Sequence, residues 1–460
     1  MSDYDPGTPD AYTQHLAEVN EKKEVLASED IVNANGVLVV AKGTPIKRDI
    51  ADKILNHKLL KPLEDTVKIE DAITGDSLFN SIKIFVNSNI DLKKIHEKHE
   101  LNKPLKALCK QYNEYSILTQ KLTVLSLRLP EEFEKGLFCS WLSVVLAKQL
   151  KLNIEQTEST FLAGLAHDIG MLHIAPEILD KTDEYTAEEW RAMQSHVVIG
   201  QRILSNMSGM PQDVSVAVLE HHERCDGTGY PSGKFAKNLT TLGQIVALAD
   251  ALYPIRFKKF VDDGRSLLET VPIMQLNDTV HFYDTYCALA LVVRSSDLTP
   301  INIVKETEIP SFIDKQLTDA STLILSCKVV VDIDKCLPND NKHQLVVACN
   351  LTDRICASLR RTGLLSAELR RWMEYVRDNK LTACYREMEE ISLMQQELSW
   401  QISRARRQLQ VVLEDKSLHK FLKKKTSLQK FYRQLCLLNE GAIPDGMNSE
   451  DIDMIEILSH

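Results

Sequence analysis

Apolar residues recur at helical spacing along most of this chain, and a strand-like pattern is confined to residues 25–70. There, the apolar runs 31–32 and 37–40 flank an Asn-Gly pair, which is a strong signal for a β-hairpin. A short amphipathic helix is predicted over residues 46–55, and residues 66–69 are a candidate third strand. We therefore predict a small α/β module. We interpret it as a structural cap, with docking or sensing as the alternative.

The segments that follow the module are patterned as helices. Residues 71–130 repeat apolar positions at helical spacing, as Leu78, Ile82 and Phe85 illustrate, and we interpret them as a helical connector. A proline at the end of this segment marks a boundary, because the residue before a proline disfavours helix. Residues 131–291 are then predicted to be a series of helices that forms the main domain.

The last third of the chain, residues 292–440, is also predicted to be helical. Its first part is ambiguous, since the apolar runs 323–325 and 329–331 fit either a strand or a buried helix. Further on, apolar residues alternate by four and three over about two heptads, which is the spacing of a coiled-coil seam. The seam residues are Leu398, Ile402, Ala405, Leu409 and Val412. This spacing leaves open whether the seam closes within one chain or between two.

Both ends of the chain are polar. Residues 1–24 contain Pro6, Gly7 and Pro9 and are predicted to be a mobile leader. Residues 441–460 hold five acidic residues and no Lys or Arg, and they form an acidic tail. The sequence therefore predicts a mainly α protein with a small β-containing module near its start and a helical C-terminal region.

The composition is that of a soluble globular protein. Apolar residues make up 44% of the chain and charged residues 26%, and the formal charge of −10 argues against a general nucleic-acid-binding protein. The ten cysteines include no C-x-x-C pair, so neither a zinc ribbon nor a disulfide framework is indicated. We find no signal peptide and no apolar run approaching the roughly 20 residues of a membrane span. These features predict a cytoplasmic protein.

The candidate chemistry is concentrated between residues 161 and 233, which hold five of the thirteen histidines. Ligand-type residues lie at or near the ends of four apolar helical runs, and a buried carboxylate beside an imidazole is costly unless it binds a cation or a partner. These residues are His167, Asp168, His196, His221, His222 and Asp250. They indicate a buried site for borderline divalent metals. His173 lies beyond the first helix, and we interpret it as structural.

Four short motifs make this pattern specific: HDIG at 167–170, a His before a Gly at 196–200, HHERCDGTGYPSG at 221–233 and LGQIVALAD at 242–250. Together they resemble the HD-GYP family, over about residues 131–265. The resemblance implies an all-helical HD-superfamily fold and hydrolysis of the bacterial second messenger cyclic di-GMP to linear pGpG or GMP. It also implies two divalent transition-metal ions, iron or manganese, bridged by Asp168.

The resemblance also implies roles for individual residues. Metal ligation falls to His167, Asp168, His196, His221, His222 and Asp250, and catalysis to His167 and Asp168. Substrate binding falls to Gly229, Tyr230 and Pro231, with Lys259 supplying positive charge nearby. Two metal ions held close together activate water for attack on phosphorus, while Tyr230 would stack on the nucleotide or hydrogen-bond to it.

The chain departs from the family pattern at three points. Glu131 and Lys135 stand where the family has an upstream Glu and His, Met171 replaces a Lys, and a later Arg-Pro-Tyr element is missing. A protonated lysine cannot ligate a metal, although Glu131 or Glu134 could replace the lost ligand. The alternative function is therefore a catalytically degenerate domain that senses a nucleotide or serves as a protein-interaction scaffold. A third interpretation is an HD-superfamily phosphohydrolase that acts on another nucleotide.

The same features set our expectations for partners. The expected ligand is a cyclic dinucleotide, with neither nucleic acid nor a membrane span involved. The GYP loop could also dock a protein partner, and the C-terminal helices could form a homodimer. Residues 416–433 carry seven Lys or Arg residues and no acid, which fits a basic helix that contacts lipid or a partner. It also fits a solvated helix that the acidic tail neutralises.

Overall fold

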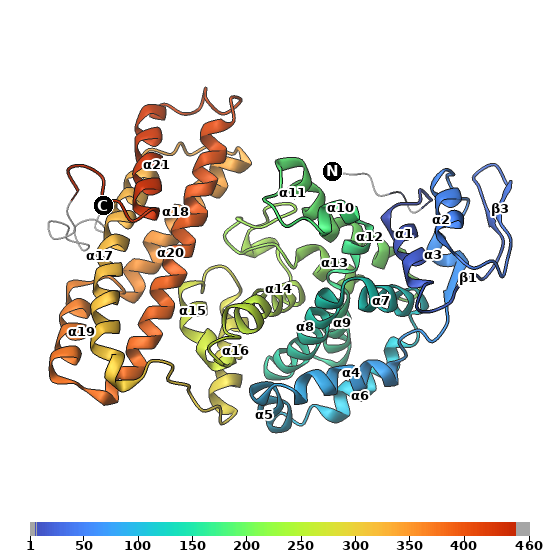
Figure 1. Ribbon diagram of the computed structural model, residues 1–460, viewed down its shortest axis with the longest axis horizontal. Coiled ribbons are helices and arrows are strands. Elements are labelled where there is room, and N and C mark those ends of the chain that lie inside the picture. The colour runs from blue at the N-terminus through green and yellow to red at the C-terminus, as the bar shows by residue number, and fades with distance from the viewer. Residues whose placement is uncertain (1–4, 6, 448–460) are drawn as a thin grey trace.

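The computed structural model describes residue 5 and residues 7–447, and that part of the chain is almost entirely helical (Figure 1). The helices form two groups that lie side by side, with α1–α16 and four short strands in one and α17–α21 in the other (Figure 1). The mainly α fold predicted from the sequence is thus confirmed. None of the described helices combines the length and the apolar character needed to cross a membrane.

The strands lie in the predicted N-terminal module. β2 (Ile31–Val32) and β3 (Leu38–Val40) pair antiparallel, which confirms the hairpin. The candidate third strand is β4 (Val67–Ile69), but it pairs with β1 (Val25–Ala27) rather than with the hairpin. The helices of the module are α2 (Arg48–Leu55) and α3 (Leu63–Thr66).

The predicted mobile leader is wrong over α1 (Ala11–Val19). The Asp10 carboxylate caps this helix by accepting a hydrogen bond from Tyr12 N. Tyr12, Leu16 and Val19 follow at helical spacing and are buried, and the helix packs on α2 and α7. A polar composition therefore concealed a short apolar stripe. Residues 1–4 and 6 lie outside the described part of the chain.

The connector and the main domain share one core with the N-terminal module. The cluster of buried apolar side chains runs from Tyr12 to Val293 without a break at Pro130, where one helix ends and the next begins. The predicted boundaries between independent domains therefore stay predictions. The helices of this region are α4 (Gly75–Asn87), α5 (Ile90–Lys98), α6 (Asn102–Tyr112), α7 (Ser116–Arg128), α8 (Pro130–Gln149), α9 (Ile154–Ala166), α10 (Pro176–Leu179), α11 (Ala187–Gln194), α12 (His196–Asn206), α13 (Gln212–Glu220), α14 (Thr241–Pro254), α15 (Thr270–Leu276) and α16 (Tyr283–Ser295).

The C-terminal helices form a bundle with a core of its own. They are α17 (Ile309–Asp334), α18 (His343–Thr362), α19 (Ala367–Asn379), α20 (Tyr385–Glu414) and α21 (Lys425–Asn439). The two ambiguous apolar runs, 323–325 and 329–331, both belong to α17, where their side chains are buried. They are therefore buried helix and not strand.

The predicted seam lies on α20 and packs against α17, α18 and α21 of the same chain. A homodimer through these residues is therefore not supported, because the apolar side chains that it needs are already buried. Of the basic segment, only the part from Lys425 onward is helical, and Leu418, Leu422 and Leu428 are buried in the bundle. Most of the predicted acidic tail, residues 448–460, lies outside the described residues.

The bundle docks on the main domain through α18 and α20. Ser358 Oγ donates to Leu276 O at 3.0 Å, and Asn277 Nδ2 donates to Glu397 Oε1 at 2.8 Å. A small apolar cluster that includes Leu393 of α20 completes the contact. This docking places the bundle beside the loop that follows α13.

Candidate metal centre

Three imidazoles of the predicted site are oriented in the same way. His167 follows the last residue of α9, His196 begins α12 and His221 follows α13. In each ring, Nδ1 donates to a carbonyl three residues earlier. The bonds join His167 to Gly164 O at 2.9 Å, His196 to Met193 O at 2.6 Å and His221 to Val218 O at 2.6 Å. Each bond fixes the tautomer that leaves Nε2 free to ligate.

A glycine lets the HD segment approach α12. A Cβ on Gly170 would lie 2.0 Å from His196 O, so no larger residue permits this packing. Ser195 separates α11 from α12, so Met193 and His196 lie on different helices. Met193 therefore contributes its carbonyl to the centre and not a helical face.

The free imidazole nitrogens converge on two carboxylates. Asp168 Oδ1 lies 3.3 Å from His196 Nε2 and 3.7 Å from His221 Nε2. The other oxygen of Asp168 lies 2.9 Å from His167 Nε2, and Asp250 Oδ1 lies 3.7 Å from the same nitrogen. Residues from four helix ends thus meet in one buried place, as the sequence predicted.

The six predicted ligands divide into two sets that share Asp168. Asp168, His196, His221 and His222 form one set, and His167, Asp168 and Asp250 form the other; within each, the ligand atoms lie within 4.8 Å of one another. Two of these atoms, His167 Nε2 and Asp168 Oδ2, are buried and lie 2.9 Å apart, and Lys135 Nζ lies 2.5 Å from the same carboxylate oxygen. Nitrogen and carboxylate donors suit divalent transition metals. The donor set therefore fits a centre for two such ions.

The local charges favour the metal-binding protonation state at Asp168, Asp250 and His221 but not at His167. Burial alone would lower the pKa of His167, but the carboxylate of Asp168 raises it to about 10. Burial alone would raise the pKa of Asp168, but His167 and Lys135 hold that pKa well below its ordinary value. The pKa of Asp250 is held low against burial in the same way, chiefly by Lys135. Burial, followed by the neighbouring His167, lowers the pKa of His221 to about 3. Ionised carboxylates and neutral imidazoles are the forms in which these side chains ligate.

Lys135 on α8 enters the centre, at the position where the resemblance led us to expect a histidine. Its Nζ lies 2.5 Å from Asp168 Oδ2, 2.6 Å from Glu132 Oε2 and 3.6 Å from Asp250 Oδ1. Burial alone would lower the pKa of Lys135, but the carboxylates of Asp168 and Asp250 hold it well above its ordinary value. The ammonium is therefore charged and cannot ligate a metal.

The acid that accompanies Lys135 is Glu132, one turn earlier on α8. The sequence had suggested Glu131 or Glu134 as replacement ligands, but both are exposed, and Glu131 pairs with Lys258 at the surface. That suggestion was wrong because residues three apart on a helix share a face more closely than neighbours do.

The glycine-rich loop after α13 packs directly on the imidazoles. The ring of Tyr230 stacks on His222, with centroids 4.7 Å apart and an angle of 29° between the planes. A Cβ on Gly229 would lie 2.4 Å from His222 O, so glycine is needed for this approach. Glu223, to which the sequence gave no role, accepts a hydrogen bond from Ser232 N at 2.7 Å and from a second loop amide. Glu223 thereby closes the loop.

Comparison with known proteins agrees with this geometry. Residues 120–286 match the HD domain family. Over 139 residues the chain is 33% identical to 3'3'-cGAMP-specific phosphodiesterase 1 of Vibrio cholerae. This alignment covers 28% of this chain and 30% of that protein. Over 113 residues it is 40% identical to a cyclic di-GMP phosphodiesterase of Thermotoga maritima, with coverage of 24% and 30%. This part of the chain belongs to the HD-GYP family.

The HD-GYP relatives are matched over only part of their length. Cyclic di-GMP phosphodiesterase PdeB of Borreliella burgdorferi is 28% identical over 202 residues, which are 43% of this chain and 48% of that protein. The chain therefore spans less than half the length of these curated relatives. A solved HDG"Y"P protein of Bdellovibrio bacteriovorus aligns with a TM-score of 0.33 and 18% identity, over 59% of this chain and 94% of that chain. The HD domain match ends at residue 286, before α17 begins.

Two further departures from the HD-GYP pattern have a structural counterpart. Met171 is buried, so the position after HDIG offers no phosphate contact. Beyond Asp250, Arg256 is bound to Asp91 through two nitrogens at 2.7 and 3.0 Å, which turns it away from the metal centre. Lys259, by contrast, lines the cavity that opens onto Asp250.

Several residues beside the HD-GYP site were missed by the sequence analysis. Arg224, His281, Arg354, Trp400 and Arg404 line cavities that also contain His222 in their walls. Three of these residues belong to α18 and α20. Nothing in the spacing of the HD-GYP motifs refers to helices so much later in the chain, so only the fold reveals them.

Proposed function

We propose that this protein hydrolyses a cyclic dinucleotide, cyclic di-GMP in the first instance, in a metal-dependent reaction. The observation that carries this proposal is the pair of buried ligand sets that share Asp168. The curated relatives of this HD-GYP domain are named as phosphodiesterases of cyclic di-GMP or 3'3'-cGAMP, which supports the substrate class. Residues 131–291 are the proposed catalytic domain.

Each residue of the centre has a role in this proposal. Two ions, iron or manganese, would be held by the two ligand sets. His196, His221 and His222 belong to one set, His167 and Asp250 belong to the other, and Asp168 belongs to both. When bound, the ions supply Lewis-acid activation of water and of the phosphodiester. The nucleotide lies against Gly229, Tyr230 and Pro231, and Lys259 adds positive charge. Water attacks phosphorus and the P–O3′ bond breaks, so one cleavage gives linear pGpG and a second gives GMP.

Lys135 favours a second candidate function, a nucleotide sensor without turnover. Its ammonium lies 2.5 Å from Asp168 Oδ2, where it balances charge that would otherwise attract a metal ion. In that case the HD-GYP domain would bind the cyclic dinucleotide, or a protein partner at the GYP loop, without cleaving it.

Metal analysis combined with a hydrolysis assay separates the two functions. After anaerobic reconstitution with Mn²⁺ or Fe²⁺, we expect about two ions per chain and conversion of cyclic di-GMP to pGpG or GMP. Asp168→Asn should lose both metal and activity, whereas Glu155→Gln, at an exposed acid in the first turn of α9, should retain both. Wild-type protein that takes up no metal and forms no product from cyclic di-GMP or 3'3'-cGAMP would reject the hydrolase. Binding of the intact nucleotide by that protein would support the sensor.

A further inference from the structure

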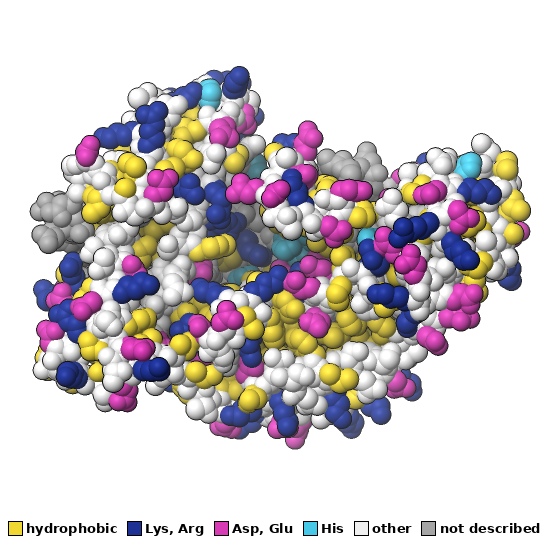
Figure 2. Space-filling model, in the orientation of Figure 1, with side chains coloured by type: hydrophobic (Ala, Val, Ile, Leu, Met, Phe, Trp, Pro, Cys, Tyr) yellow, Lys and Arg dark blue, Asp and Glu magenta, His cyan; other side chains and the backbone are white. Residues whose placement is uncertain are grey.

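Two adjoining cavities border the metal centre, in the space between the HD domain and the C-terminal bundle. One has a volume of about 810 Å³ and lies along the GYP loop, and the other has a volume of about 720 Å³ and reaches Lys135 and Asp250. His222, Arg224, Trp400 and Arg404 line both cavities. Figure 2 shows Lys, Arg and His side chains gathered in this hollow. The bundle is therefore part of the boundary of the site.

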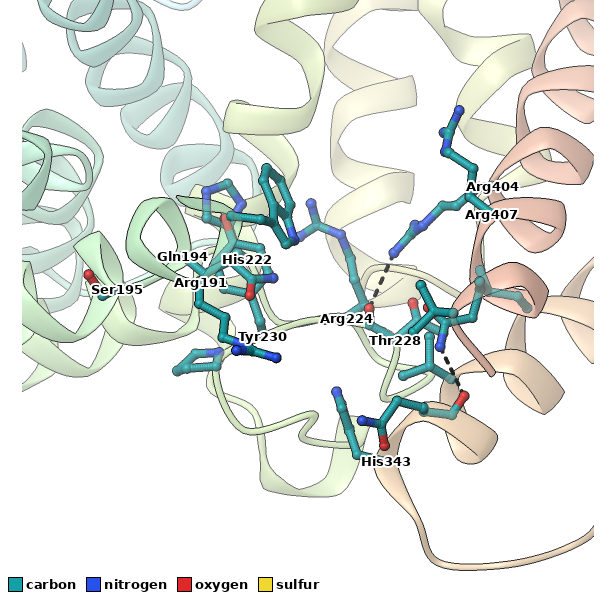
Figure 3. A pocket seen from close by; sticks show the side chains of 18 of the residues that line it. Arg191, Gln194, Ser195, His222, Arg224, Thr228, Tyr230, His343, Arg404 and Arg407 are labelled. Carbon is teal, nitrogen blue, oxygen red and sulfur yellow. Dashed lines mark hydrogen bonds between the residues drawn. The ribbon is translucent and has the colours of Figure 1, made fainter. Parts of the chain in front are cut away.

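Guanidinium groups gather where the two cavities meet. Arg404 Nη2 of α20 reaches across to the GYP loop and donates to Thr228 O at 3.2 Å (Figure 3). Arg224 Nη1 donates to His221 O at 3.1 Å, and neither arginine forms an ion pair with an acid among the described residues. Burial and the nearby guanidinium of Arg354 lower the pKa of Arg404 to about 10, which indicates that positive charges lie close together here.

A third arginine of this cluster has N–H donors that form no hydrogen bond. Arg354 of α18 is almost fully buried, and its Nη1 donates to Asp226 Oδ2 at 3.1 Å. Its Nε and Nη2 atoms are also buried but have no hydrogen-bond partner. Unsatisfied buried donors beside unpaired arginines are expected where an anion binds.

Exposed aromatic rings flank the same space. Trp400 is 51% exposed and Trp190 is 48% exposed, and both line the larger cavity. The guanidinium of Arg404 lies over the ring of Trp400, 5.9 Å from its centroid. An aromatic face in a positively charged groove is a platform on which nucleobases stack.

We propose that α20 forms the second wall of the substrate site, with Arg404 binding a phosphate of the cyclic dinucleotide and Trp400 stacking on one of its bases. This inference rests on the proposed function, because it names contacts to the same substrate. A cyclic dinucleotide has two phosphates and two bases, so one phosphate at the metal centre places the other half of the ring in an adjoining cavity. Guanidinium groups match phosphate geometry, and α20 supplies charge that the HD domain lacks at Met171 and Arg256.

The test compares full-length Arg404→Gln and Trp400→Ala with Arg386→Gln, a control elsewhere on α20 at an exposed ion pair with Glu390. We expect Arg404→Gln to weaken cyclic di-GMP binding roughly tenfold or more, which corresponds to the loss of one charge-assisted hydrogen bond. Trp400→Ala should weaken it about fivefold or more. Binding is measured by calorimetry in an Asp168→Asn background, and KM is measured in the otherwise unaltered chain.

Conservative variants separate substrate contact from structural support. Arg404→Lys and Trp400→Phe should recover much of the affinity at unchanged melting temperature. Equal affinity and KM in wild type, Arg404→Gln and Trp400→Ala would overturn the inference even if the chain hydrolyses cyclic di-GMP. If wild-type protein binds cyclic di-GMP without cleaving it, and Arg404→Gln weakens that binding, the hydrolase proposal is rejected. The proposal that α20 forms a wall of the nucleotide site is then supported. A loss that Arg386→Gln shares, or one explained by a lower melting temperature, would also count against the wall.

Discussion

Three of the four imidazoles of the candidate metal centre donate a hydrogen bond to a carbonyl three residues earlier, which sets their orientation without a metal. The position of the Lys135 side chain is equally well defined, because three carboxylates surround its ammonium. In the proposed centre, this ammonium and a metal ion would compete for the same oxygen of Asp168.

Replacing Lys135 tests this competition. Lys135→His removes the ammonium and adds a ligand-type ring, so metal content and kcat should both rise, while Lys148→His on the exposed side of α8 should change neither. In metal-free protein, Lys135→Met leaves Asp168 and Asp250 uncompensated, and we expect a loss of about 3–5 kcal/mol in the free energy of unfolding. Mn²⁺ should restore the stability of Lys135→Met.

Mass-spectrometric metal analysis and urea unfolding measure these two effects. A Lys135→Met chain as stable as wild type without metal would show that the ammonium does not balance the carboxylates.

The six candidate ligands could be identified from the sequence because each lies in a short motif at or near a helix end. Glu132 could not, since its contact with Lys135 depends on the rotation of α8 about its own axis. Arg404 could not either, because its position depends on how a separate bundle docks.

Among the elements of the N-terminal part, α1 contacts the ligand-bearing segment directly. Asp10 Oδ2, at the start of α1, lies 2.7 Å from His173 Nδ1, and His173 Nε2 lies 3.0 Å from Lys121 Nζ of α7. His173 ends the 3₁₀ helix Ile169–His173, which begins directly after Asp168. The N-terminal helix thus contacts the segment that carries the bridging carboxylate, through the histidine that we interpreted as structural.

The attachment of α1 should depend on pH through His15. Burial, followed by the charge of Arg128, lowers the pKa of His15 to about 4, against about 6.5 in an unfolded chain. The folded protein takes up this proton less readily than the unfolded chain, so stability should fall as pH drops from 6.5 towards 4. The loss should reach at most about 3 kcal/mol.

Urea unfolding of wild type and His15→Gln between pH 4 and 7 measures the contribution of His15. The variant should show a shallower slope than wild type in this range, because His221 and other buried histidines still contribute, and it should keep the behaviour of wild type above pH 7. Identical slopes in the two proteins would contradict the role of His15.

Most elements could be predicted because their apolar positions alternate with polar ones, as in the β2–β3 hairpin and in α20. Elements were not predicted correctly where the contrast between apolar and polar positions was weak. The first helix was hidden in a polar segment, and the apolar runs of α17 are buried on too many sides to show a period. The pairing of β4 with β1 depends on tertiary contacts that local pattern does not encode.

For the whole molecule, the seam on α20 determines how the C-terminal bundle responds to mutation. Leu409 is 2% exposed and packs among helices of its own chain. Leu409→Ala should therefore lower the free energy of unfolding by about 2–5 kcal/mol, as expected for a cavity in a core. It should leave the sedimentation coefficient of the folded protein unchanged. A wild-type oligomer that this variant dissociates would contradict the intramolecular packing of the seam.

The hydrogen bonds from the bundle to the GYP loop also limit how this protein can be divided. Asn350 and Arg354 of α18 bind Asp226, and Arg404 of α20 binds Thr228. The HD domain therefore cannot be moved into another protein without the bundle and still keep these contacts. A chimaera that ends at residue 291 would carry every candidate ligand, yet its loop would face solvent in place of the arginines that now hold it.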